Sequence, residues 1–198
     1  MPKYPIAALF LAACLPNAAH AQDQPIRGFT GAHVGLDTVY DWDESQQPGS
    51  NTAKSRGGFG VRGHIGLDMP VASTVLVGAE FGIGTGGRTS DQASLGGGRY
   101  RLNPGVNYDL TGRIGIALHP SVMVYAKAGY HWMEREVIIS GQATGNATNK
   151  ATQRGFRYGG GVELHMAPEC AMRIEVSHSS LGDSLRQTRV SFGPLVRF

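Results

Sequence analysis

Most of the chain beyond residue 28 alternates apolar side chains with glycine or polar side chains, position by position. Segment 59–68 is the clearest case. Its odd positions hold phenylalanine, valine, glycine, isoleucine and leucine, and its even positions hold glycine, arginine, histidine and aspartate. Successive side chains of a β-strand point to opposite faces of the sheet. A period of two therefore predicts strands with one apolar and one polar face.

Eight segments carry this alternation, and the links between them differ in length. The segments are 29–40, 59–68, 75–84, 108–118, 122–132, 155–166, 171–178 and 185–198. The short links, each with a proline, are 68–74, 119–121 and 167–170. The long polar links are 41–57, 85–107 and 133–154, and a shorter one lies at 179–184. Short turns at one end and long loops at the other are typical of a barrel that crosses a bacterial outer membrane.

The polar faces carry charges of both signs among many glycines. Glycine accounts for 29 of 198 residues, about twice its usual share. Eight strands enclose an interior that side chains nearly fill, so glycine would leave room for long charged side chains that pair with one another. This pairing predicts a plugged lumen with limited pore activity. The predicted lumen charge network consists of Arg62, Glu80, Arg113, Lys127, Glu163 and Glu175.

The N-terminus has the three parts of a secretory leader. A short segment with one lysine precedes an apolar run at 6–15, and Ala19 and Ala21 supply the small residues that a signal peptidase recognises. The run is too short for a transmembrane helix, which needs about 20 apolar residues. We therefore predict a cleavable signal peptide at 1–21 and an outer-membrane barrel domain at 22–198.

The cysteines and histidines argue against a metal or cofactor site. Cys14 completes a lipoprotein-like sequence, which gives lipidation as an alternative route of processing. Cleavage after Ala21 would leave Cys170 alone, which excludes an intramolecular disulfide and a cysteine-rich metal site. Seven histidines follow no HxxxH or HExxH spacing. The net charge of +3 and the lack of a basic stripe argue against a nucleic-acid partner.

Aromatic residues lie at the ends of several predicted strands. Tyr40 and Trp42 end the first, Tyr108 opens the fourth, and Tyr130 and Trp132 end the fifth. Membrane barrels carry aromatic girdles where the strands leave the lipid. Ordinary cross-strand packing of aromatic rings is the alternative interpretation.

Several stretches have the form of motifs from a known family. They are 29–36, the central pair 112–115 and 124–130, the pair 155–163 and 173–176, and the terminal Phe198. On these residues the chain resembles the small outer-membrane β-barrel proteins of the opacity and porin-family type, and more distantly the OmpA membrane domain. In that family the last residue is the signal read by the barrel-assembly machinery. Pro194 departs from the pattern and implies a local break in the last ladder.

Together these patterns predict an all-β fold, an eight-stranded antiparallel transmembrane up-and-down β-barrel preceded by a signal peptide. The resemblance implies a location in the bacterial outer membrane. The implied partners are outer-membrane lipids and lipopolysaccharide, the barrel-assembly machinery and an unidentified surface ligand. The implied role is structural or surface-interacting, exerted through extracellular loops, with no catalytic residues.

Two other functions fit parts of the sequence. His178 and Ser180 resemble the His-x-Ser of lipid A deacylases, and residues two apart share one face of a strand. However, Leu181 replaces the asparagine of that family, and the nearby acids are Glu175, on the opposite face, and Asp183. The other alternative is a soluble periplasmic β-barrel or sandwich that binds a ligand, since soluble sheets also alternate.

Overall fold

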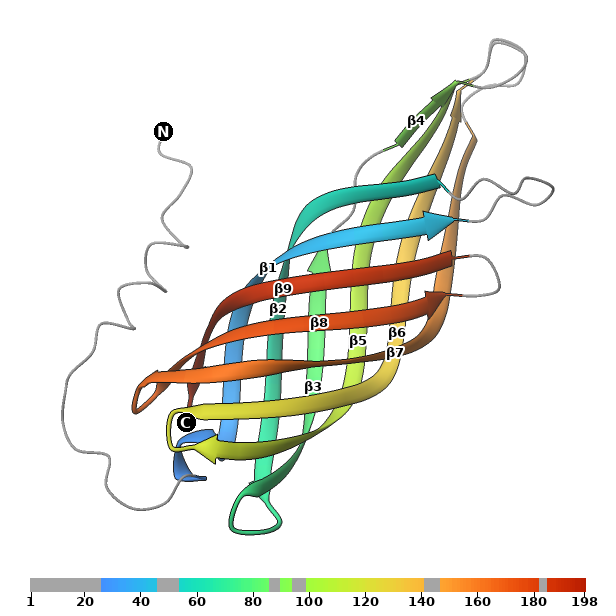
Figure 1. Ribbon diagram of the computed structural model, residues 1–198. Coiled ribbons are helices and arrows are strands. Elements are labelled where there is room, and N and C mark those ends of the chain that lie inside the picture. Colours follow the sequence, from blue (N-terminus) through green and yellow to red (C-terminus); the bar gives the residue numbers. More distant parts are fainter. Residues whose placement is uncertain (1–25, 46–53, 86–89, 94–98, 141–146, 182–184) are drawn as a thin grey trace, which may run out of the picture.

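The computed structural model describes residues 26–45, 54–85, 90–93, 99–140, 147–181 and 185–198. They form one short 3-10 turn, η1 (Arg27–Phe29), and nine strands (Figure 1). The strands are β1 (Gly31–Ser45), β2 (Lys54–Pro70), β3 (Val75–Thr85), β4 (Ser90–Ala93), β5 (Arg99–His119), β6 (Val122–Ser140), β7 (Ala147–Ala167), β8 (Cys170–Leu181) and β9 (Leu185–Arg197). Within these ranges no helix is long and apolar enough to cross a membrane.

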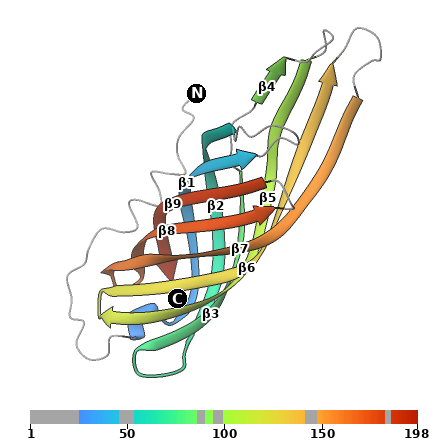
Figure 2. The ribbon, with the colours of Figure 1, turned by 45° about the vertical axis from the view of Figure 1, so that its right-hand side comes forward.

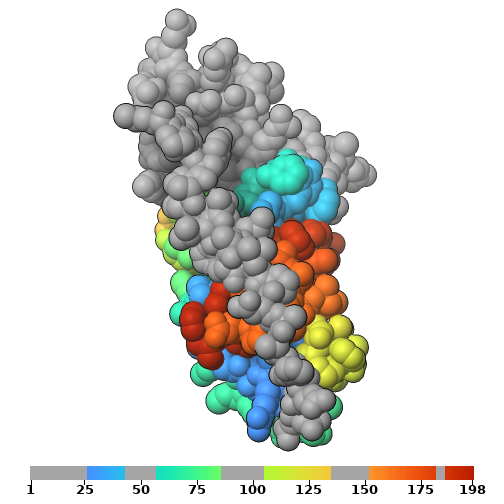
Figure 3. All heavy atoms as spheres, turned by 90° about the vertical axis from the view of Figure 1, so that its left-hand side faces the viewer, coloured from blue at the N-terminus to red at the C-terminus, as the bar shows by residue number. Residues whose placement is uncertain are grey.

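Eight of the strands close into a barrel. Neighbours follow the order β3-β2-β1-β9-β8-β7-β6-β5-β4, and a further pairing joins β3 to β5. Every pairing is antiparallel. The first and last strands of the chain lie side by side, and the strands tilt together around the barrel (Figure 2). In the space-filling view, atoms from the blue and the red ends of the described chain accordingly lie next to each other (Figure 3). The predicted eight-stranded antiparallel barrel is therefore confirmed.

The two faces of each strand separate as the alternation predicted. On β2, Arg62 and His64 are buried, whereas Val61 and Ile65 are 54% and 58% exposed. A closed sheet leaves no unpaired edge, and an apolar outer face suits a hydrocarbon environment. The large apolar side chains on this outer face include Phe59, Val61, Ile65, Leu67, Phe81, Ile83, Leu110, Ile114, Ile116, Tyr158, Val162, Ile174, Val176 and Phe192.

Several strands extend further than the sequence predicted. Long links were expected at 85–107 and 133–154, but β5 already begins at Arg99, β6 continues to Ser140 and β7 begins at Ala147. A short extra strand, β4, pairs only with β5 among the described strands. The alternation of apolar and polar residues identifies the part of a strand that has one apolar face. Backbone hydrogen bonds between strands do not require this alternation and can continue beyond it. The prediction was therefore wrong about strand length at the long-loop end.

The proline in the last strand interrupts one ladder, as predicted. Between β1 and β9, Gly35 pairs with Leu195, and pairing resumes only at Thr38 and Phe192. The register is unchanged on the two sides of this gap. Proline lacks a backbone N–H, so Pro194 has no hydrogen to donate to a neighbouring strand.

An apolar cluster fills the lumen at the end with the short turns. Ile26 and Phe29, which precede β1, are buried against inward-facing side chains, namely Leu76, Ala117, Met123 and Tyr125. Arg197 Nη1 donates a hydrogen bond of 2.6 Å to the carbonyl oxygen of Phe29. The segment around η1 therefore covers this end of the barrel from inside.

Candidate functional site

The six residues of the predicted lumen network are all buried inside the barrel and joined by ion pairs. Arg62 Nη2 lies 2.9 Å from Glu80 Oε1, and Arg113 Nη1 lies 2.7 Å from Glu163 Oε1. Lys127 Nζ lies 2.7 Å from Glu175 Oε1 and 3.4 Å from Glu80 Oε1. Tyr125, an inward neighbour of Lys127, donates a hydrogen bond of 2.7 Å to Glu175. The structure thus brings the six together across strands far apart in the sequence.

Glu80 is the most heavily contacted acid of this network. Besides Arg62 and Lys127, its carboxylate receives Arg173 Nη1 at 2.5 Å and lies 3.8 Å from Arg113 Nη1. The Glu80 side chain is fully buried. A buried carboxylate is stable only with such partners, because burial of an unpaired charge costs several kcal/mol.

The network extends beyond the six residues named for it. Arg173 binds Glu163 at 2.8 Å, and Arg197 joins Glu163 to Asp68 at 2.8 and 2.7 Å. Asp109 sits between two arginines, at 2.6 Å from Arg62. These residues lie on the same inward positions as the six that were selected. The alternation of the sequence already puts them on the polar face of their strands.

The buried charges of the described lumen balance. Seven acids face seven bases, so the interior needs no counter-ions when its histidines are neutral. The acids are Asp37, Asp41, Asp68, Glu80, Asp109, Glu163 and Glu175. The bases are Arg62, Arg113, Lys127, Arg157, Arg173, Arg189 and Arg197.

Inward-facing glycines provide the space for these side chains, as the sequence predicted. A Cβ atom at Gly82 would overlap the guanidinium of Arg62, and one at Gly78 would overlap the carboxylate of Asp68. Glycine lies beside these long side chains on the neighbouring strand. In a barrel of eight strands, this is how large polar side chains fit without distorting the wall.

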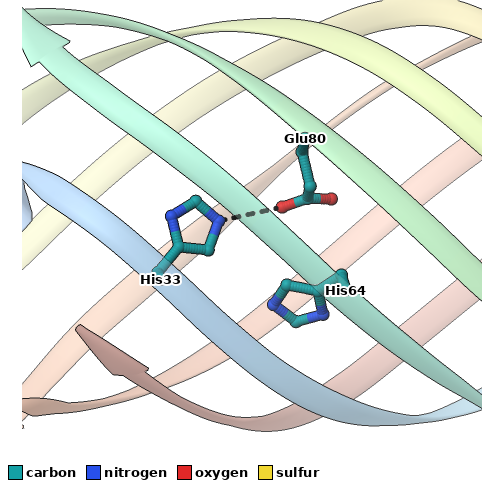
Figure 4. Close-up of side chains that lie close together, drawn as sticks. All are labelled: His33, His64 and Glu80. Carbon is teal, nitrogen blue, oxygen red and sulfur yellow. Dashed lines mark hydrogen bonds and ion pairs between the residues drawn. The ribbon is translucent and has the colours of Figure 1, made fainter. Parts of the chain in front are cut away.

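A histidine cluster lies among these charges, and the spacing of histidines in the sequence did not reveal it. His33 on β1, His64 on β2 and Glu80 on β3 each offer one ligand atom, and these atoms lie within 4.8 Å of one another (Figure 4). His64 follows His33 by 31 positions and Glu80 follows His64 by 16, so no local sequence motif could reveal the cluster. Only the register of three adjacent strands brings them together.

Aromatic rings lie on the outer face near the long-loop end. The rings of Tyr40 and Trp42 lie 4.5 Å apart, and those of Tyr130 and Trp132 lie 5.6 Å apart. Tyr40 also contacts Phe59 across the strand pair, at 4.7 Å. Both arrangements that the sequence left open, rings at strand ends and cross-strand ring contacts, are therefore present.

The residues of the enzyme alternative do not assemble into a catalytic group in the described structure. His178 and Ser180 share the outer face of β8, but Nδ1 of His178 lies 3.1 Å from Oγ1 of Thr188. Glu175 faces the lumen and is bound to Lys127. Asp183 lies outside the described residues.

The remaining predicted site residues lie at the two ends of the chain. Ala19 and Ala21 of the predicted cleavage site, together with Cys14, lie outside the described residues. Phe198 is 79% exposed at the short-turn end, and its backbone N–H donates a hydrogen bond of 2.8 Å to the carbonyl oxygen of Ala32.

A closed barrel with an apolar outer face and a charged interior defines a β-barrel membrane protein. The profile of the outer membrane protein β-barrel domain family matches residues 6–198. The chain therefore belongs to this family and is a protein of the bacterial outer membrane. A comparison with curated protein sequences finds no significant match.

Solved structures with the same fold share little sequence with the chain. Ail, the attachment invasion locus protein of Yersinia pestis, is 15% identical over 85% of this chain and 99% of Ail, with a TM-score of 0.53. Neisserial surface protein A is 14% identical over 85% of this chain and 98% of that chain, with a TM-score of 0.57. A major outer membrane protein from Thermus thermophilus is 12% identical, with coverages of 83% and 99% and a TM-score of 0.50. At these identities the similarity supports the fold alone.

Proposed function

We propose that this protein is a membrane-embedded scaffold that acts at the cell surface through its long loops, and that its lumen does not conduct large solutes. The observation that carries this proposal is the balanced, ion-paired interior. A pore needs a continuous aqueous path. Here long charged side chains meet across the lumen, and an apolar cluster fills the short-turn end.

The arrangement of the loops supports a role at the surface. In outer-membrane barrels the short turns face the periplasm and the long loops face outward. Loops carry binding functions more readily than the rigid strands that position them. The structure of Ail in complex with the heparin analogue sucrose octasulfate is a precedent for ligand binding by a barrel of this fold. For the present chain, a surface ligand is part of the proposal.

We also propose that the protein is not an enzyme. The His178 ring is hydrogen-bonded to Thr188, and the nearest described acid on β8, Glu175, points into the lumen. A serine nucleophile needs a histidine within hydrogen-bond distance and a third group that orients this histidine. This geometry gives Ser180 no such partner among the described residues.

Three further assignments belong to the same proposal. The precursor is cleaved after Ala21, and the mature barrel is inserted by the barrel-assembly machinery, which recognises the terminal Phe198. The exposed position of Phe198 at the end of the last strand would allow the assembly machinery to recognise it before the barrel closes. Lipopolysaccharide and other outer-membrane lipids contact the apolar outer face.

A loop-replacement experiment tests the role at the surface. In a strain that lacks the protein, we would express the wild type or a variant in which residues 46–53 and 141–146 are replaced by Gly-Ser linkers of equal length. Replacement of the short turn 71–74 is the matched control. Binding of the cells to immobilised heparin and to mammalian cell layers is the readout.

We expect the variant with replaced loops to bind like the strain without the protein, and the short-turn control to bind like the wild type. All three proteins must reach the outer membrane in equal amounts, with heat-modifiable migration on gels. Equal binding by the wild type and the strain without the protein would contradict a surface-interaction role.

A further inference from the structure

Three potential metal ligands, His33, His64 and Glu80, lie close together on the inner wall of the barrel. In one row across the sheet, His33 on β1 pairs with Gly66 on β2, which pairs with Glu80 on β3. His64 lies in the next row of β2, where it pairs with Gly35 and Gly82. In the first row glycine separates His33 from Glu80, and in the second row a glycine flanks His64 on each side, so the three side chains lie close together over the sheet (Figure 4).

The two histidine rings occupy the space that these glycines leave. A Cβ atom at Gly35 would lie 2.5 Å from Nε2 of His64, and one at Gly66 would lie 2.6 Å from Nε2 of His33. Any larger residue would force the rings away from each other. The wall is therefore shaped around the imidazole rings.

A carboxylate lies behind each histidine. Nδ1 of His33 lies 3.3 Å from Asp68 Oδ2, and Nδ1 of His64 lies 3.2 Å from Asp37 Oδ2. Metal-bound histidines usually direct the other ring nitrogen to such a carboxylate, which fixes the tautomer and orients the ring. Neither Nδ1 makes a hydrogen bond of good geometry to another described residue in this arrangement. With the proton on Nδ1, Nε2 of each ring is the atom that would bind an ion.

Nε2 of His33 and Oε2 of Glu80 face the same guanidinium, because Arg173 Nη2 lies 3.5 Å from the first atom and Arg173 Nη1 lies 2.5 Å from the second. Nε2 of His33 lies 3.4 Å from Oε2 of Glu80, and with the proton on Nδ1 both atoms are acceptors. Nε2 of His64 has no hydrogen-bond partner among the described residues, although the ring is buried. A buried polar group without a partner is costly, and a bound cation would satisfy Nε2 of His64.

We propose that His33, His64 and Glu80 form a binding site for a divalent transition-metal ion of the Zn²⁺ type inside the lumen. Two imidazole nitrogens and one carboxylate oxygen suit such an ion, and a water molecule would complete its coordination. Ligands of a tetrahedral zinc ion lie about 3.4 Å apart at the usual bond lengths. The distance from His33 to Glu80 already has this value, and a small rotation of His64 would bring the third ligand into place.

The surrounding charges can rearrange to accept the ion. Arg173 Nη1, at 2.5 Å from Glu80 Oε2, is the group that the ion would displace. Arg173 keeps two bonds to Glu163, from Nε at 3.2 Å and from Nη2 at 2.8 Å. Asp37 and Asp68 bring negative charge to the two histidines from behind. The ion therefore competes with the contacts that Arg173 makes to Glu80 and to His33.

Metal titration of the purified barrel tests this site. The protein is extracted from outer membranes in detergent, stripped with a chelator and titrated with Zn²⁺ in a calorimeter. Cu²⁺ loading followed by electron paramagnetic resonance then counts the coordinating nitrogens. We expect one Zn²⁺ per chain and a Cu²⁺ spectrum with two imidazole nitrogens.

Three variants separate the proposed ligands from other histidines. His64→Gln removes a ligand and is expected to weaken Zn²⁺ binding at least about tenfold, and Asp37→Asn, behind the ligand, about 10–100-fold. His131→Gln is the matched control, because His131 is a fully buried lumen histidine on β6 that lies outside the cluster. It should bind Zn²⁺ like the wild type.

Two results would overturn the proposal. One is a wild-type barrel that binds no Zn²⁺ at micromolar concentrations. The other is equal Zn²⁺ binding by the wild type and the His64→Gln variant. Heat-modifiable migration shows that each variant is folded. If His64→Gln does not fold, His33→Gln takes its place in the same comparison.

Discussion

Arg62 and Ile65 lie three residues apart on β2, yet Arg62 is 1% exposed and Ile65 is 58% exposed. The inner face of the strand makes specific charged contacts, whereas its outer face presents apolar side chains, of which Phe59 contacts the ring of Tyr40. Arg62 meets Glu80 and Asp109 at 2.9 and 2.6 Å. The same alternation of side chains therefore carries two constraints. Positions on the inner face need particular charged residues, whereas positions on the outer face need an apolar side chain.

Loss of the central acid should produce the largest difference between the faces. Glu80→Ala leaves Arg62, Lys127 and Arg173 without a shared partner, so we expect a loss of about 3–5 kcal/mol in the free energy of unfolding. Phe81→Leu, one position away on the outer face, should cost less than about 1.5 kcal/mol. Urea titration of barrels folded in lipid vesicles measures both. Equal losses in the two variants would break the comparison.

A charge placed on the outer face should also be costly. Ile114 is 52% exposed on β5, next to the inward-facing Arg113. We expect Ile114→Arg to lower the free energy of unfolding by about 2–4 kcal/mol, because the guanidinium would enter the hydrocarbon region. The same urea titration gives the value. Ile114→Val serves as control, and an arginine variant as stable as this control would show that the outer face is not in lipid.

Glycine should matter on the inner face and be replaceable on the outer face. Gly82→Ala would overlap the Arg62 guanidinium, so we expect a loss of about 1–3 kcal/mol from the displaced ion pairs. Gly63→Ala is the matched control, since the nearest atom to its Cβ lies at 4.0 Å. It should change stability by less than about 0.5 kcal/mol. A larger loss at Gly63 than at Gly82 would contradict the proposed role of the inner glycines.

The smallest effect is expected at the outer polar pair on β8 and β9. His178→Ala removes one hydrogen bond to Thr188, which is worth about 0.5–1.5 kcal/mol. Mass spectrometry of lipid A from cells with the wild type, the variant or no protein should give identical profiles. A lipid A species that depends on His178 would establish the enzyme alternative.

The sequence predicted the fold well because the period of two is a local property. It placed eight strands, both faces and the gap at Pro194, where the missing N–H interrupts the ladder. It underestimated β5, β6 and β7, because backbone pairing continues beyond the part of a strand that needs an apolar face. Strand extent therefore depends on the partner strand as well as on side-chain pattern.

The site was harder to predict because it depends on register. Alternation indicated that Arg62, Glu80 and their neighbours point inward, but not which of them touch. His33 and His64 were treated as scattered, although the pairing of His33 with Gly66 and of His64 with Gly35 brings them together. A shift of one strand by two residues would preserve the apolar pattern and separate the cluster. Contacts of this kind become visible only when the register is known.

In our proposal paired charges close the lumen, and a conductance recording is the direct test of this closure. The purified barrel is inserted into a planar lipid bilayer in 1 M KCl. At this ionic strength the interaction between exposed charges is screened beyond roughly 3 Å. We predict no large, stable open channel, because the lumen pairs are buried and screened little by salt. A steady, large conductance in most single insertions would contradict the account.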